Sequence, residues 1–171
     1  MKKLYLMCAA ALLGVSAVGC TNNNSSNANN NRTETTSTKA SANNLKITKD
    51  LEKQFNSDND KIVAVDVKTD VVDDQSKDNK PHEEIKVTVK DKDTIEKLKT
   101  DKNAIDNGNA SDDQKMYIAG IQDIISNEAK KLNNNADTIT FGYKMDADNT
   151  MLIAGSSKTK DFVKPVEINI D

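Results

Sequence analysis

The stretch that decides the fold is IVAVDVKTDVV, residues 62–72, in which apolar and polar residues alternate. An extended chain places its four odd-numbered valines on one face and the small or charged residues between them on the other, because side chains alternate across a strand. The same alternation returns at residues 85–89, so the two stretches are predicted to pair as a β-hairpin. Residues 73–83 between them are polar and include Pro81, which predicts a long exposed loop.

The longest regular element is predicted between Ser111 and Leu132. Gln114 follows Ser111 at the spacing of a capping box, and Asp112 and Asp113 favour the positive end of a helix dipole. Apolar residues then recur at spacings of three and four, at Tyr117 or Ile118, Ile121, Ile125, Ala129 and Leu132. This periodicity predicts a long helix, 111–133, with one buried stripe.

Shorter elements are expected around these two features. Residues 45–55 and 94–100 are predicted to form short helices, and residues 101–110, with Asn107-Gly108, are expected to form turns. Further strands are predicted at 139–143, at 151–154 and, after Pro165, at 166–170. The expected fold is a single α+β domain over residues 45–171. Its antiparallel sheet of about four to five strands would pack against the 111–133 helix, because the strands alternate instead of being continuously apolar.

The first twenty residues, MKKLYLMCAAALLGVSAVGC, have the layout of a secretory signal. Lys2 and Lys3 precede an apolar run over residues 4–18, which is shorter than the roughly 20 residues that a membrane-spanning helix needs. The next residues, Ala17-Val18-Gly19-Cys20, resemble the lipobox of bacterial prolipoproteins. That resemblance implies removal of residues 1–19 and lipid attachment at Cys20. The alternative is ordinary signal-peptide cleavage after Ala17, which would leave Cys20 as a free thiol.

The segment after Cys20 is predicted to be a disordered tether. Residues 21–44 contain nine Asn and nine Ser or Thr, and no Leu, Ile, Val or aromatic residue. Such a composition buries too little apolar surface to offset its ordering entropy. A flexible chain of this length spans about 27 Å on average. The expected organisation is therefore a cleaved signal peptide at 1–19, a lipidated tether at 20–44 and the domain at 45–171.

Charge and cysteine content exclude several classes of function. The 24 basic residues include Lys2 and Lys3, so the chain from Cys20 onward carries 22 basic and 27 acidic residues and a net charge near −5. The lysines are interspersed with acids, whereas nucleic-acid binding requires clustered basic residues, so no nucleic-acid partner is expected. Cys8 lies in the discarded segment. An internal disulfide and a cysteine nucleophile are therefore not expected.

No catalytic constellation is predicted. His82 is the only histidine, and its place in the expected loop favours a solvated turn residue whose replacement by Ala would leave folding unchanged. Four pairs of carboxylates occur, and we interpret them as solvated turns or, for Asp112-Asp113, as a helix start: Asp73-Asp74, Glu83-Glu84, Asp112-Asp113 and Asp146 with Asp148. We therefore expect no catalytic residue, no cofactor and no metal.

Three short acidic loops keep calcium binding open as an alternative. Asp58, Asp106 and Asp146 each begin a run that offers hard oxygen ligands, but none has the twelve-residue layout of an EF-hand. We interpret these loops as turns. The expected function is a membrane-anchored extracytoplasmic lipoprotein of the bacterial cell envelope that acts as a non-enzymatic binding or interaction module. The alternative is a carboxylate-based secreted hydrolase or a calcium-binding surface protein.

Overall fold

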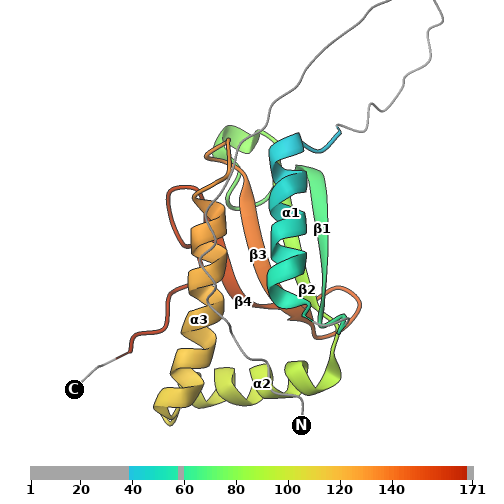
Figure 1. Ribbon diagram of the computed structural model, residues 1–171. Helices are drawn as coiled ribbons and strands as arrows, with labels where there is room; N and C mark the ends of the chain where they lie inside the picture. The colour runs from blue at the N-terminus through green and yellow to red at the C-terminus, as the bar shows by residue number, and fades with distance from the viewer. Residues whose placement is uncertain (1–38, 58–59, 169–171) are drawn as a thin grey trace, which may run out of the picture. The chain divides into compact units, whose positions relative to one another are not determined.

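The computed structural model describes residues 39–57 and 60–168 of the chain. The signal segment, Cys20 and most of the predicted tether lie outside these residues. The described residues form eight elements: α1 (Ala42–Phe55), β1 (Val63–Val71), the 3₁₀ turn η1 (Lys77–Asn79), β2 (His82–Val89), α2 (Lys92–Asp106), α3 (Asp112–Ala129), β3 (Thr138–Lys144) and β4 (Thr150–Ser157). The fold is α+β, as the sequence predicts (Figure 1).

The four strands form one mixed sheet in the order β1-β2-β3-β4. The predicted hairpin is confirmed, because β1 and β2 pair antiparallel with Val65 opposite Val87. β3 and β4 form a second antiparallel hairpin, but β2 and β3 pair parallel, with Val87 opposite Phe141. The expectation of a purely antiparallel sheet is therefore wrong. Parallel neighbours need a long crossover connection, and α2 and α3 together provide it.

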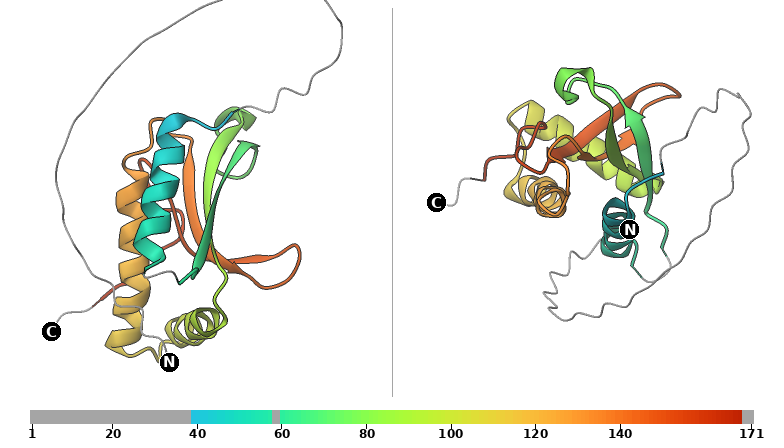
Figure 2. Two further views of the ribbon diagram at one scale, coloured as in Figure 1. Left: turned by 45° about the vertical axis from the view of Figure 1, so that its right-hand side comes forward. Right: turned by 90° about the horizontal axis from the view of Figure 1, so that it is seen from above.

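Two helices cover one face of the sheet. Figure 2 shows α1 and α3 side by side on that face, with α2 crossing below the end of the sheet. α1 packs chiefly on β1, and α3 packs on β4 and β3. The rings of Phe55 and Phe141 lie 4.9 Å apart between centroids and join α1 to the centre of the sheet. The expectation of one long helix, 111–133, against the sheet with shorter helices elsewhere is met only in part, because α3 is shorter, at 18 residues, and the 14-residue α1 covers the same face.

The capping box at the start of α3 is confirmed. The Ser111 hydroxyl accepts from the Gln114 backbone N–H, and the Gln114 side chain accepts from the Ser111 backbone N–H. α3 ends at Ala129, three residues before the predicted final apolar residue, Leu132, which is nevertheless buried. The buried apolar stripe of this helix is as predicted, since Ile118, Ile121 and Ile125 all lie in the core.

α2 is longer than its sequence pattern predicts. It extends through residues 101–106, which were expected to form turns. Asp101 lies inside it, only 3 % exposed, and accepts hydrogen bonds from Lys97 and, at 3.0 Å, from Gln114 Nε2 of α3. A partner in another helix thus stabilises the last turns of α2, and the local sequence does not reveal that partner.

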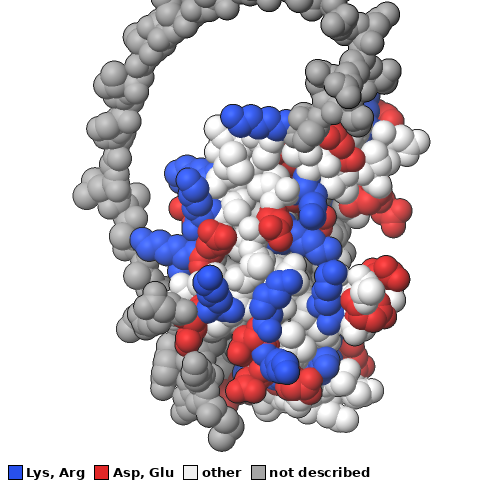
Figure 3. Space-filling model, turned by 90° about the vertical axis from the view of Figure 1, so that its right-hand side faces the viewer, with Lys and Arg blue, Asp and Glu red and all other residues white. Residues whose placement is uncertain are grey.

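The last described segment also departs from expectation. Residues 158–168 contain no regular strand, so the predicted fifth strand at 166–170 does not form over its described part, 166–168. The chain instead folds back along β4, where Phe162 N donates to Gly155 O at 2.8 Å, and then crosses to α3. Charges of both signs are interspersed on the side of the molecule where β1 lies (Figure 3).

Candidate functional site

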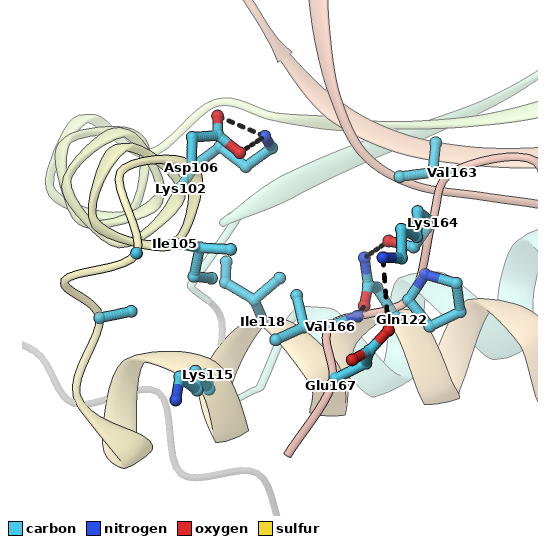
Figure 4. Close-up of a pocket in the computed structure, with 13 residues that line it drawn as sticks. Lys102, Ile105, Asp106, Lys115, Ile118, Gln122, Val163, Lys164, Val166 and Glu167 are labelled. Atoms are coloured by element: carbon cyan, nitrogen blue, oxygen red, sulfur yellow. Dashed lines mark hydrogen bonds and ion pairs between the residues drawn. The ribbon is translucent and has the colours of Figure 1, made fainter. Parts of the chain in front are cut away.

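A concave site lies between α2, α3 and the C-terminal segment. It has a volume of about 430 Å³, which is within the usual size range of small-ligand pockets. The end of α2, the α2–α3 loop, the first half of α3 and residues 163–167 form its walls (Figure 4). We call this site the α2–α3 groove. It is lined by Lys102, Ile105, Asp106, Gly108, Ala110, Lys115, Ile118, Gln122 and residues 163–167.

The inner surface of the α2–α3 groove is more apolar than polar. Ile105 comes from the last turn of α2, and Ile118 comes from the buried stripe of α3 and is only 1 % exposed. From the C-terminal segment, Val166 lies beside Ile118 (Figure 4), and Val163 and Pro165 also line the groove. Burying apolar surface supplies about 25 cal/mol per Å², so the half-buried Ile105 and the partly exposed apolar side chains of residues 163–166, rather than the buried Ile118, give the site its capacity to hold an apolar group.

The rim of the groove is charged, with three lysines and two acids. Lys102 Nζ lies 2.5 and 2.6 Å from the two carboxylate oxygens of Asp106, and Lys164 Nζ lies 3.3 Å from Glu167 Oε1. Lys115 Nζ is 3.8 Å from Asp112, which does not line the groove. Exposed ion pairs of this kind contribute roughly 0–1 kcal/mol, so a ligand carboxylate can compete for these lysines at small cost.

Gln122 fixes the wall that faces α3. Its side chain is 8 % exposed. Nε2 donates to the carbonyl of Ile153 in β4 at 3.0 Å and to the carbonyl of Lys164 at 3.2 Å, while Oε1 accepts from Val166 N at 2.8 Å. One amide therefore joins α3, β4 and the C-terminal segment. The sequence analysis did not single out Gln122. Its position four residues after Ile118 places it on the buried stripe of α3. A polar side chain at such a position is expected to form hydrogen bonds inside the protein.

A second polar cluster surrounds His82. The expectation of a solvated loop residue is wrong, since His82 is the first residue of β2 and its side chain is fully buried. Its Nδ1 lies 3.1 Å from the Ser76 hydroxyl, and its Nε2 lies 3.4 Å from the Thr138 hydroxyl and 3.8 Å from an Asp73 carboxylate oxygen. The imidazole thus joins the 72–81 loop to β3, because the loop folds over it.

The neighbouring acid is also structural. Glu83 was expected in a loop, but it lies in β2, and its carboxylate accepts from the backbone N–H of Ser41 at 2.9 Å. Asn44 Nδ2 joins Glu83, at 2.7 Å, to Asp137, at 3.0 Å, and the Asp137 carboxylate also accepts from Glu83 N. These donors tie the start of α1 to β2 and β3. Asn44 was predicted to be tether; α1 begins at Ala42, so ordered structure starts before Leu45.

The remaining acidic candidates make local interactions. Asp146 accepts from the Asn149 side chain and from the backbone N–H groups of Asn149 and Asp148, and these hydrogen bonds lower the pKa of its carboxyl. Asp106 pairs with Lys102. Asp58 lies outside the described residues. Over 39–57 and 60–168, no three His, Cys, Asp or Glu side chains gather in a way that could hold a metal ion.

Comparisons with protein-family models, with curated proteins and with solved structures found no match to this chain. Within the described part of the chain, no helix is both long and apolar enough to cross a membrane. The lipid attachment predicted at Cys20 falls outside the described residues.

Proposed function

We propose that this protein is a lipoprotein anchored through Cys20 on the extracytoplasmic side of a bacterial membrane, and that its domain is a non-enzymatic binding module whose site is the α2–α3 groove. The anchor is supported by the signal segment and by the resemblance of residues 17–20 to a lipobox. The polar composition of residues 21–44 supports a tether that holds the domain away from the membrane surface.

The observation that carries the binding function is an apolar groove whose rim has more lysines than acids. Lys102, Lys115 and Lys164 line it against Asp106 and Glu167. The matching occupant is a short peptide segment that alternates apolar and acidic side chains. Its apolar groups would pack against the half-buried Ile105 and Val166, and its carboxylates would meet the rim lysines. Both acids of the rim pair with lysines, an arrangement that suits recognition better than hydrolysis.

Binding is tested with two fluorescent peptides of equal length, one alternating Leu with Glu and one alternating Leu with Lys. We expect preferential binding of the acidic peptide, which weakens as salt rises. Reversing two rim charges with Lys115→Glu and Lys164→Glu should weaken it by about tenfold. Lys158→Glu is the matched control, since this exposed lysine does not line the groove. Equal affinity of both peptides, or equal loss in the control, would contradict the assignment.

The anchor is tested separately with Cys20→Ser. This variant should remain unlipidated and unprocessed by the lipoprotein pathway, so mass spectrometry should find residues 1–19 still attached. The wild type should partition into detergent, because its two acyl chains contribute about 0.8 kcal/mol per buried CH₂. Wild-type protein found entirely in the aqueous phase, with its N-terminus at Val18, would show ordinary signal cleavage instead.

A further inference from the structure

β1 leaves one edge of the sheet open. It is the first strand in the order β1-β2-β3-β4, so within residues 39–57 and 60–168 only one of its sides pairs with another strand. Lys90 N donates to Ile62 O, which shows that the backbone groups of the even-numbered residues point toward β2. Those of Val65 and Val67 therefore point outward, because the direction alternates along an antiparallel strand.

Only the beginning of this edge is capped by the domain itself. The Asn56 side chain accepts from Val63 N at 2.9 Å and donates to Val63 O at 3.1 Å, so its amide occupies the position of a partner strand. Among the described residues, none bonds the outward backbone groups of Val65 or Val67. The opposite edge differs, because the chain after β4 folds back onto it at Gly155 and Ser157.

We propose that β1 pairs antiparallel with β1 of a second copy of this chain, in a two-fold symmetric register centred on Val67. In that register Val65 lies opposite Thr69 of the second copy, and Asp66 lies opposite its Lys68. The outward backbone groups of both strands then satisfy one another, and the two sheets become one continuous sheet.

Charge complementarity selects this register. Within one chain Asp66 already lies opposite Lys86, and Lys68 lies opposite Glu84. Pairing about Val67 extends these charge pairs into rows across the two copies. Each row runs from Lys86 and Asp66 of one copy to Lys68 and Glu84 of the other, and the sign of the charge alternates at every step. Opposite charges directly across a strand pair are favourable and like charges are unfavourable.

The other symmetric registers are worse. Centring on Asp66 places two Asp66 carboxylates opposite each other, and centring on Lys68 does the same with two ammonium groups. The ladder centred on Val67 is complete within residues 65–69. Centring on Val65 leaves a shorter ladder, because its next pair needs the backbone of Val63, which Asn56 already occupies. Centring on Thr69 needs residues on both sides of Asp70, whose φ of 58° is incompatible with extended pairing.

The neighbouring flank of α1 is compatible with a second copy. Asn43 and Gln54 bond Lys131 and Glu128, so this side of α1 faces away from the open edge. At 100° per residue, Leu45 falls on the opposite flank, beside β1. Leu45 is 40 % exposed, and a second β1 strand with its own α1 would cover it.

The register is tested in the full chain by Val67→Cys, with Thr69→Cys as the matched control. Across the two-fold axis the introduced thiols at position 67 oppose each other, whereas those at position 69 are separated by four residue positions, too far for a disulfide. Under mild oxidation we expect a disulfide-linked dimer for Val67→Cys and no more dimer for Thr69→Cys than for wild type. Equal cross-linking of both variants, or of neither, would overturn the proposal.

Charge reversal gives an independent test with differently tagged full-length copies. Asp66→Lys alone and Lys68→Asp alone each place like charges opposite one another twice, so self-association should fall by about tenfold. A mixture of the two variants restores opposite charges at both positions and should co-purify as well as wild type does. Failure of wild-type copies to co-purify, or failure of the mixture to recover, would refute pairing through β1.

Discussion

Replacing Gln122 by Leu should loosen the C-terminal wall of the α2–α3 groove. Leucine keeps most of the volume of glutamine but cannot form hydrogen bonds. The substitution therefore leaves three backbone groups without the amide: the carbonyls of Ile153 and Lys164, and the N–H of Val166. These three bonds are what join the C-terminal segment to α3 and β4 at this point.

The expected loss of stability follows from the burial of each bond. The Ile153 carbonyl is buried, and leaving such a group unpaired costs about 1–3 kcal/mol. The bonds to Lys164 and Val166 are only partly buried, so water can replace the amide and each contributes about 0.5–1 kcal/mol. The sum is about 2–5 kcal/mol, which corresponds to a fall of about 10–15 °C in Tm.

Two measurements check this result. Thermal unfolding reports the global loss, and digestion with chymotrypsin reports release of the segment by cutting after Phe162. Gln122→Glu is a second variant to compare with Gln122→Leu. Its carboxylate can still accept a hydrogen bond from Val166 N, but it repels the carbonyl oxygens of Ile153 and Lys164. It should be less stable than Gln122→Leu at neutral pH and should recover in acid, where the new carboxyl regains a donor. Unchanged melting and digestion in both variants would refute the role given to Gln122.

Two further changes test the core. His82→Ala removes a fully buried ring and its contacts to Ser76 and Thr138, so urea unfolding should show a loss of about 2–4 kcal/mol in the free energy of unfolding. Proteases should then cut within residues 73–80. A loss below about 0.5 kcal/mol would indicate that His82 is a solvated residue after all. Burial, followed by the nearby Asp101 and Asp91, raises the pKa of Tyr117 to about 12, so the unfolded chain loses this proton first and stability falls as pH rises from about 10 to about 12. The Tm of Tyr117→Phe should fall less steeply with pH over that range than the Tm of the wild type. Equal slopes for the two proteins would contradict the raised pKa of Tyr117.

Local sequence was sufficient to predict the β1–β2 hairpin, the start of α3 and the buried side of that helix, because each depends on residues close together in the chain. Alternation at 62–72 specifies a strand with one buried face, and residues 85–89 repeat it at a distance that allows a hairpin. Ser111 and Gln114 satisfy each other's backbone groups within one turn, so the start of α3 is encoded within four residues. The spacing of Ile118, Ile121 and Ile125 likewise determines which side of that helix is buried, since the helical period fixes the stripe.

Tertiary structure decided what depends on partners distant in the chain. The parallel pairing of β2 with β3 follows from the path of two helices, and alternation alone does not distinguish it from antiparallel pairing. α2 continues past residue 100 because the Asp101 carboxylate accepts a hydrogen bond from Gln114 of α3. His82 is buried because the 72–81 loop folds over it. The groove exists because Gln122 holds a C-terminal segment that has no regular structure of its own. The spacing of apolar residues in the sequence predicts which side chains are buried, whereas only tertiary packing determines which of the buried side chains contact one another.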